Sequence, residues 1–304
     1  MADLSIGGII PPLVTPLSGS CTLDREALCR IIDHLVEGGV TGIFLLGSTG
    51  EWASLPAEAR KEVVIQGIAC THGRLPVWVN ISDNSLVEVQ RKADEAALAG
   101  ADGLVMAPPG YYSMTQDELR KFLDLAIEGI PLPVMLYNAP QYTRTVLAPE
   151  TVRALSNHDN VLGIKDSSGD LDYLSSLIRT NPPKGFSILV GSETLLWESR
   201  QMGCKGGVCG GANLFPLLYS QFFQTMQGGD PDRITRYQLL IRRIQEEVYH
   251  NFTTTLSHVI GLKYLMELRG LCRSQMAAPV YQQLTPAQKR SMSKLLDEFI
   301  AMVF

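Results

Sequence analysis

The segment 161–170 reads Val161-Leu162-Gly163-Ile164-Lys165-Asp166-Ser167-Ser168-Gly169-Asp170, a short apolar run that ends in a lysine and then breaks into small polar residues. The apolar part shows no strict alternation, which predicts a strand buried on both faces, as in a parallel sheet. An ammonium group at the end of such a strand is costly unless it is neutral or paired. Lys165 is therefore either a neutral amine, which can attack a ketone to form a Schiff base, or a charge that reaches water from the strand end.

The other lysines have different surroundings. Lys61, Lys92 and Lys121 each follow an arginine inside a charged helical pattern. The remaining ones lie in loops or amphipathic helices and are Lys184, Lys205, Lys263, Lys289 and Lys294. Lys165 alone ends an apolar strand.

Similar apolar runs recur through the first two thirds of the chain. The eight expected strands are 9–17, 42–48, 77–82, 103–108, 134–138, 161–165, 188–191 and 206–210. Amphipathic helical segments separate most of them, the clearest being 24–37, 56–69, 85–99 and 115–127. Thr22 is the expected N-cap of the first of these helices, and Thr115 opens the last with the spacing of a capping box.

Eight strand–helix units in about 225 residues fit a (β/α)8 TIM barrel, which typically takes about 250 residues. A doubly wound open sheet is the competing fold, but no GxGxxG sequence follows an early strand. After Asn213 the strand pattern stops, and 232–250, 253–268 and 286–303 are expected to be helices. We therefore expect a barrel domain over residues 1–228 and a C-terminal α-helical extension over residues 229–304.

The composition narrows the class of protein. Of the 304 residues, 45% are hydrophobic and 19% charged, which is typical of a globular protein with ample core. The net charge of -5 argues against nucleic acid or an anionic membrane as the main partner. The first residues lack the pattern of a signal peptide, and no apolar stretch is long enough to span a bilayer.

The cysteines form no CxxC pair and accompany no histidine cluster. They are Cys21, Cys29, Cys70, Cys204, Cys209 and Cys272. This pattern predicts reduced, mostly buried thiols in a cytoplasmic protein, without a zinc site.

Polar residues gather at the ends of the expected strands, where barrel enzymes carry their chemistry. They are Ser48 and Thr49, Tyr111 and Tyr112, Tyr137 and Asn138, Lys165 to Ser168, Ser192 and Glu193, and Gly210 and Gly211. Each group has an ordinary structural explanation as a turn, a surface aromatic pair or a core tyrosine. Together, however, a hydroxyl-rich turn for a carboxylate and a tyrosine beside a lysine are what a 2-keto acid bound to a lysine needs.

At this point the chain resembles the pyruvate-dependent class I aldolases of the dihydrodipicolinate synthase and N-acetylneuraminate lyase family. Four motifs carry the resemblance, in the order and on the strands where the family has them. They are Gly47-Ser48-Thr49-Gly50-Glu51, Pro109-Gly110-Tyr111-Tyr112, Tyr137-Asn138-Ala139-Pro140 and Gly163-Ile164-Lys165-Asp166. The resemblance covers essentially the whole chain, including the C-terminal helices.

The resemblance implies a role for each site residue. Lys165 forms the Schiff base with pyruvate or another 2-keto acid, and Tyr137 shuttles protons. Tyr112 enters the site of a neighbouring subunit and completes a hydroxyl relay with Ser48 and Tyr137. The other expected substrate-binding residues are Ser48, Thr49 and Gly50 for the carboxylate, with Ser167, Gly191, Glu193, Val208 and Tyr142 around the pocket. The family is usually a homotetramer, and the lysine imine acts as the electron sink, so no cofactor or metal is implied.

The departures from the family's patterns concern the second substrate. Dihydrodipicolinate synthases carry an arginine where this chain has Tyr142, and here an arginine appears only at Arg144. Sialic acid lyases have an Asp-Glu pair and a serine where this chain has Glu193-Thr194 and Gly210. The run 206–213 is more similar to members that cleave keto-deoxy acids. We therefore expect an aldolase acting on a 4-hydroxy-2-keto acid, with pyruvate and an aldehyde as its partners.

Three alternatives stay open at this stage. They are a synthase that condenses pyruvate with aspartate semialdehyde, a degenerate binding protein on the same fold, and a metal-dependent barrel aldolase. The joint presence of Lys165, Tyr137, Tyr112 and a hydroxyl pair favours an enzyme over a binding protein. The absence of clustered His, Asp and Glu at the strand ends speaks against a metal-dependent aldolase.

Overall fold

The computed structural model describes residues 6–250, 256–277 and 282–303. The chain divides into two compact units, of which the first comprises residues 1–8 and 76–208 and the second comprises residues 9–75 and 209–304. The expected boundary between residues 228 and 229 falls inside the second unit and stays a prediction. Part of the helix expected at 253–268 lies outside the described residues.

The main sheet contains eight strands in the order β1-β10-β9-β8-β7-β6-β5-β4, so strands that follow one another in the chain are neighbours. Every adjacent pair from β5 to β10 is parallel. The strands are β1 (Gly8–Ile9), β4 (Ile43–Leu45), β5 (Val77–Asn80), β6 (Gly103–Met106), β7 (Val134–Asn138), β8 (Val161–Asp166), β9 (Ser187–Val190) and β10 (Gly206–Gly207). All eight predicted strands are present, most of them shorter than predicted, and the (β/α)8 fold class is confirmed.

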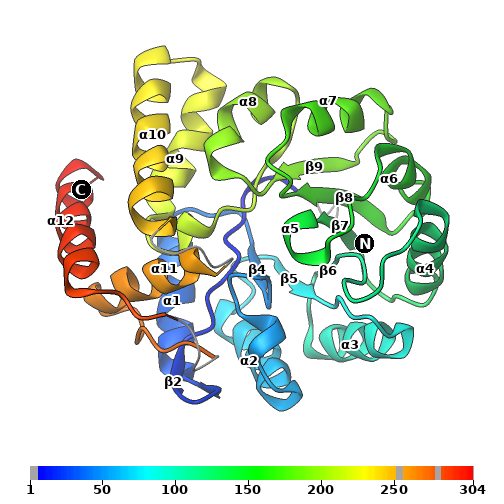
Figure 1. The fold of residues 1–304 in the computed structure, drawn as a ribbon, viewed down its shortest axis with the longest axis horizontal. Coiled ribbons are helices and arrows are strands. Elements are labelled where there is room, and N and C mark those ends of the chain that lie inside the picture. Colours follow the sequence, from blue (N-terminus) through cyan, green and yellow to red (C-terminus); the bar gives the residue numbers. More distant parts are fainter. Residues whose placement is uncertain (1–5, 251–255, 278–281, 304) are drawn as a thin grey trace. The chain divides into compact units, whose positions relative to one another are not determined.

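Helices flank the strands of the first unit, as Figure 1 shows. They are α3 (Leu86–Ala99), α4 (Gln116–Glu128), α5 (Pro140–Thr143), α6 (Pro149–Leu155), α7 (Leu171–Arg179) and α8 (Leu196–Gln201). Thr115 caps α4 in the predicted capping box, because its side chain accepts from the Glu118 N–H while the Glu118 carboxylate accepts from the Thr115 N–H. Strands β5 to β9 have almost wholly buried residues, which explains why they lack alternation.

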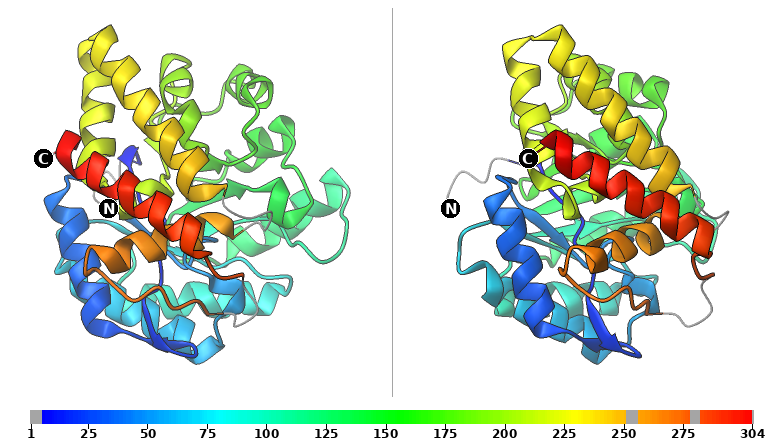
Figure 2. Two further views of the ribbon diagram at one scale, coloured as in Figure 1. Left: turned by 60° about the vertical axis from the view of Figure 1, so that its left-hand side comes forward. Right: turned by 90° about the vertical axis from the view of Figure 1, so that its left-hand side faces the viewer.

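The second unit holds a small hairpin and most of the longer helices. The hairpin pairs β2 (Leu17–Gly19) with β3 (Thr22–Leu23). The helices are α1 (Arg25–Glu37), α2 (Ala57–Thr71), α9 (Pro216–Gly228), α10 (Pro231–Ile244), α11 (Ser257–Leu268) and α12 (Pro286–Val303), and a π-helix, η4 (Gln245–Tyr249), directly follows α10. In both views of Figure 2, α12 runs alongside α10, and it packs on α11. Phe299 of α12 is buried with its ring 5.1 Å from that of Phe215.

The expected N-cap of α1 was wrong, and α9 was not predicted. Thr22 does not cap α1, because it belongs to the hairpin; Asp24 is the cap, and its carboxylate accepts from the Ala27 N–H. The structure also adds α9, a largely buried helix whose apolar residues surround it instead of forming one stripe. A helix of this kind gives no amphipathic pattern from which to predict it.

The prediction that all cysteines are reduced was also wrong. Cys29 of α1 and Cys70 of α2 form a disulfide, with their Cα atoms 5.0 Å apart. The two residues are 41 positions apart in the chain, and packing of α1 against α2 brings them together. Of the other four cysteines, Cys204, Cys209 and Cys272 are buried, as predicted, and Cys21 is partly buried.

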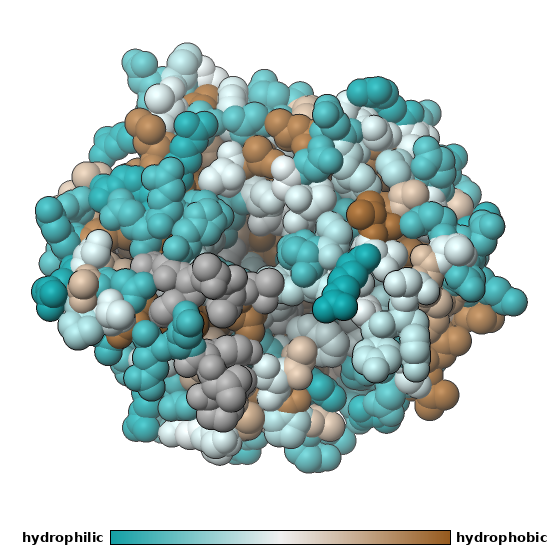
Figure 3. All heavy atoms as spheres, in the orientation of Figure 1, coloured by the Kyte–Doolittle hydropathy of each residue, from teal (hydrophilic) through white to brown (hydrophobic). Residues whose placement is uncertain are grey.

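The surface is mixed in polarity. On the face drawn in Figure 3, hydrophilic side chains predominate and the hydrophobic ones lie in separate places. Among the described residues, no helix is both long enough and apolar enough to cross a membrane.

Candidate active site

Lys165 and Tyr137 lie next to each other on two neighbouring strands. In the parallel pairing of β7 with β8 their Cα atoms are partners, so both side chains leave the sheet on the same face. The Lys165 Nζ lies 4.1 Å from the centroid of the Tyr137 ring, and both residues are buried. The structure thus brings together the predicted nucleophile and the predicted proton carrier within the first unit.

Gly191 and Ser167 stand against the same lysine. A Cβ built on Gly191 would overlap the Ser167 hydroxyl and approach the Lys165 Cε to 3.1 Å. Real Cβ atoms rarely come so close, so a side chain at position 191 would displace Lys165 or Ser167. The Gly191 N–H donates to the Asp166 carbonyl, which holds the glycine beside the end of β8. Glycine at 191 therefore leaves the space that Ser167 occupies, with Lys165 directly beside it.

A second pair, Asn138 and Asp166, lies one residue further along the two strands. The Asn138 amide donates to the Asp166 carboxylate at 2.8 Å, and Asn138 Oδ1 accepts from the Leu147 N–H. The Ser168 N–H and hydroxyl also donate to Asp166. Burial raises the pKa of the Asp166 carboxyl above its ordinary value, and the hydrogen bonds only partly oppose this. The sequence motifs contained both residues, but their spacing did not show that they bond to each other.

The turn 47–51 belongs to the second unit. Its backbone bonds run from the Gly50 N–H to the Gly47 carbonyl and from the Glu51 N–H to the Ser48 carbonyl. A Cβ at Gly50 would come within 2.9 Å of the Leu13 carbonyl oxygen, which explains the glycine. The Thr15 hydroxyl donates to the Gly50 carbonyl at 2.7 Å. Thr49 is buried and Ser48 half-buried, so the turn holds its hydroxyl side chains in a fixed backbone frame.

The remaining predicted site residues all lie in the first unit, at or beyond the ends of strands. Tyr112 is 73% exposed and forms a T-shaped pair with Tyr111, with ring centroids 4.8 Å apart. Tyr142 is half-buried in α5, whereas Arg144, its C-cap in left-handed conformation, is exposed. Glu193 is buried at the start of a 3-10 turn, and Val208 is buried after β10.

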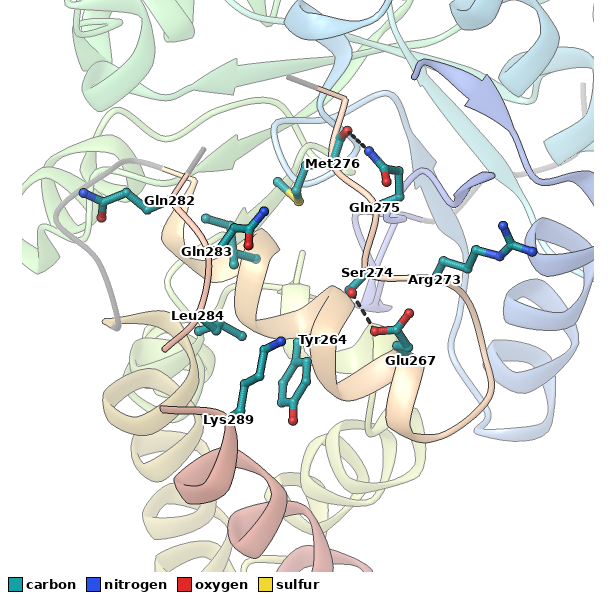
Figure 4. Close-up of a pocket in the computed structure, with 11 residues that line it drawn as sticks. Tyr264, Glu267, Arg273, Ser274, Gln275, Met276, Gln282, Gln283, Leu284 and Lys289 are labelled. Atoms are coloured by element: carbon teal, nitrogen blue, oxygen red, sulfur yellow. Dashed lines mark hydrogen bonds between the residues drawn. The ribbon is translucent and has the colours of Figure 1, made fainter. Parts of the chain in front are cut away.

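No metal-binding cluster of three or more His, Cys, Asp or Glu residues occurs among the described residues. A separate cavity of about 390 Å³ lies in the second unit between α11 and the segments 273–276 and 282–284 (Figure 4). It contains none of the predicted site residues.

Residues 5–299 match the model of the dihydrodipicolinate synthetase family. The chain belongs to this family. The solved structure of dihydrodipicolinate synthase from Bacteroides thetaiotaomicron is similar, with a TM-score of 0.91 and 39% identity over 96% of this chain and 98% of the other. This match also supports the fold class described above.

Two further relatives have different named activities. YagE of Escherichia coli K12, a putative 2-dehydro-3-deoxy-D-gluconate aldolase, is 30% identical over 296 residues, covering 96% of each chain. Its structure in complex with pyruvate has a TM-score of 0.90 at 28% identity, over 97% of this chain and 99% of the other. The 4-hydroxy-tetrahydrodipicolinate synthase of Methanoculleus marisnigri is 30% identical over 292 residues, 95% of this chain and 98% of the other. The chain is a lyase of this family.

Proposed function

We propose that the chain is a Schiff-base aldolase that cleaves or forms a 4-hydroxy-2-keto acid, with pyruvate and an aldehyde as the other reactants. One observation carries the proposal: the buried Lys165 Nζ lies 4.1 Å from the Tyr137 ring, on the same face of two paired strands. A buried lysine amine beside a tyrosine is an arrangement suited to imine formation and proton transfer.

In the cleavage direction, the neutral Lys165 amine attacks the C2 carbonyl, and loss of water leaves a protonated imine. Tyr137, left as a phenolate after protonating the departing water, takes the proton of the C4 hydroxyl, the C3–C4 bond breaks, and the aldehyde departs. The bonding electrons move into the imine to give an enamine. A proton added at C3 and water added at C2 then release pyruvate and the free lysine. The imine nitrogen accepts an electron pair when the C3–C4 bond breaks and returns it when C3 is protonated, so these steps call for no further electron sink.

The remaining roles follow from the family resemblance. Ser48, Thr49 and Gly50 bind the carboxylate of the keto acid through hydroxyl and backbone N–H groups. Ser167, Gly191 and Val208 shape the pocket around the imine, while Glu193 and Tyr142 contact the part of the substrate that becomes the aldehyde. Tyr112 acts in the site of a neighbouring subunit, and the working form is a cytoplasmic homotetramer.

Covalent trapping tests the proposal. Incubation with pyruvate and borohydride is expected to leave one reduced pyruvate adduct per chain at Lys165, located by peptide mass spectrometry. Lys263 is the internal control, because it is also a buried lysine but bonds to a carboxylate. An adduct on Lys263 or on any other lysine, or no adduct on the wild-type chain, contradicts the proposal. A Lys165→Ala chain should fold and show no adduct.

A synthase that condenses pyruvate with aspartate semialdehyde is the second candidate. The 39% identity to the Bacteroides thetaiotaomicron synthase favours it. Against it, the semialdehyde carries its own carboxylate, for which a guanidinium offers two parallel charge-assisted bonds. Tyr142 offers one neutral hydroxyl, and the side chain of Arg144 is exposed.

Steady-state kinetics separate the two candidates. We expect measurable cleavage of 2-keto-3-deoxy sugar acids, read by pyruvate release, and weak condensation of pyruvate with aspartate semialdehyde. A specificity constant for the semialdehyde of about 10⁴ M⁻¹s⁻¹ or more would place the chain among ordinary synthases. Replacing Arg144 by Met in that case should remove the rate.

A further inference from the structure

Glu51 and Lys263 form an ion pair whose two side chains have no exposed surface. The Lys263 Nζ lies 2.5 Å from Glu51 Oε1, and each side chain is 0% exposed. Lys263 belongs to α11 of the C-terminal extension, 212 residues from Glu51 in the chain. The pair therefore joins the end of the turn 47–51 to a helix that the barrel fold itself does not require.

A third segment completes the arrangement. Lys263 Nζ also donates to the Gln275 carbonyl at 2.7 Å, and the Ala277 N–H donates to Glu51 Oε2 at 2.8 Å. Both oxygens of the carboxylate thus have a donor, one charged and one from the backbone. Figure 4 shows the segment 273–276 running beside α11. The Glu51 carboxylate is therefore fixed by two donors, the Lys263 ammonium and the Ala277 N–H.

Stability alone does not explain such a pair. Removing two charges from water costs several kcal/mol for each ion, and replacing a buried pair by apolar residues is often neutral or stabilising. A buried, fully bonded ion pair can instead hold the backbone in one fixed geometry. Glu51 has a φ of 56° and Leu46 a φ of 58°, both in the left-handed region. A residue with a side chain keeps this strained conformation only when surrounding contacts hold it there. These two residues flank the part of the turn that carries Ser48 and Thr49.

Helix α11 reaches the turn at a second point. The Thr49 hydroxyl contacts His258 Nε2 at 3.4 Å, five positions before Lys263. The His258 ring packs edge-on against Tyr249, with centroids 5.7 Å apart. Tyr249 ends the π-helix η4, a rare element that often marks functional sites. A Cβ on Gly261 would collide with the Val248 carbonyl, so close packing of α11 on η4 depends on this glycine.

We propose that Glu51 and Lys263 are positioning residues that fix the turn 47–51 in the conformation that binds the substrate carboxylate. The proposal rests on the assignment of Ser48 and Thr49 to the carboxylate. It makes the C-terminal extension a determinant of keto-acid affinity, although the residues that react with the substrate lie elsewhere in the chain.

The test measures borohydride trapping at Lys165 as a function of keto-acid concentration, with pyruvate and with its neutral methyl ester. In Glu51→Gln and Lys263→Met, the pyruvate concentration for half-maximal trapping should rise about tenfold to a hundredfold, the cost of losing a hydrogen bond to a charged group. The value for methyl pyruvate should change little. A general loss of structure would raise both values together, so equal effects on the two compounds would overturn the proposal.

The double variant Glu51→Leu/Lys263→Met covers the case in which a single variant does not fold, because it leaves no buried charge unpaired. It should fold, as judged by circular dichroism, and still have a raised half-saturation for pyruvate. A folded double variant with wild-type half-saturation would overturn the proposal.

Arg243→Met is the matched control. It removes ion pairs to Glu247 and Glu298 within the same extension without touching the turn. Its half-saturation for pyruvate should equal that of the wild type. If its half-saturation for pyruvate rose as much as that of Glu51→Gln, the effect would come from a general loss of packing in the extension, and the proposal would be overturned. Absence of trapping in the wild type is a different result, because it refutes the proposed function itself.

Discussion

At the scale of single residues, two buried lysines have different environments. Lys165 contacts the face of an aromatic ring and stands beside a glycine, whereas Lys263 is bonded to a carboxylate and a carbonyl. The Tyr137 ring beside Lys165 supports Lys165 as the nucleophile, and the ion pair with Glu51 supports a positioning role for Lys263.

Gly191→Ala tests the space around Lys165. The added methyl group would overlap Ser167 Oγ, which must turn away, and lie 3.1 Å from Lys165 Cε, which must give by a few tenths of an ångström. A displacement of about 1 Å in a reacting group can cost about a hundredfold in rate, so for this smaller shift we expect a smaller but measurable loss in kcat. Activity and thermal unfolding should be measured together.

Gly228→Ala provides the comparison for this prediction. Nothing lies within 4 Å of a Cβ at Gly228, the last residue of α9, so activity should be unchanged. Wild-type kcat in Gly191→Ala would show that Lys165 does not need the position that the structure gives it.

At the scale of elements, the pairing of β7 with β8 sets the site. The register places Tyr137 opposite Lys165 and Asn138 opposite Asp166. The first pair therefore has its side chains on one face of the sheet and the second pair on the other face. The Asn138–Asp166 hydrogen bond adds a side-chain link to the backbone ladder at this point. A shift by one residue would separate Tyr137 from Lys165, since it turns one of them to the other face.

Asp166→Asn should change how stability depends on pH. Burial raises the pKa of Asp166 in the folded chain above its ordinary value of 3.8, so ionisation is less favourable in the folded state than in the unfolded state. Its contribution to stability is therefore lost as the pH rises above 3.8 through the folded pKa. The Tm of Asp166→Asn relative to the wild type should increase over that range, as measured by differential scanning calorimetry.

Asp94→Asn, at an exposed position of α3, is the control for this measurement. Its Tm difference from the wild type should show no comparable rise with pH. A flat or falling difference for Asp166→Asn would mean that the hydrogen bonds from Asn138 and Ser168 outweigh the burial of the carboxyl group.

At the scale of the whole molecule, Tyr111 and Tyr112 are notable for their exposure. They are 77% and 73% exposed, which is unusual for two large aromatic residues packed against each other. The proposed homotetramer gives Tyr112 a place in the site of a neighbouring subunit. Such a role predicts that a subunit lacking Lys165 can still supply a working Tyr112.

Mixed oligomers test this role. A Lys165→Ala chain should be inactive because it lacks the nucleophile, and a Tyr112→Phe chain should have low activity, because loss of a proton relay costs about 10²–10⁴-fold. When unfolded together and refolded, they should regain part of the wild-type activity through sites that combine Lys165 of one chain with Tyr112 of the other. If separation by distinct affinity tags confirms mixed oligomers and the activity does not return, Tyr112 acts within its own chain or has no catalytic role.

The sequence by itself determined the strands, the fold class and the motifs that carry the family resemblance. These follow from local patterns, since a strand buried on both faces has a continuous apolar run wherever its partner lies. The tertiary structure decided the contacts between distant residues: Cys29 with Cys70, Asn138 with Asp166, and Glu51 with Lys263. Lys263 was expected to lie in a loop or an amphipathic helix, yet most residues of α11 are buried, and the burial of Lys263 depends on a carboxylate 212 residues away. Tertiary packing decides such pairs, because the free-energy cost of burying a charged side chain is offset only when its oppositely charged partner is buried beside it.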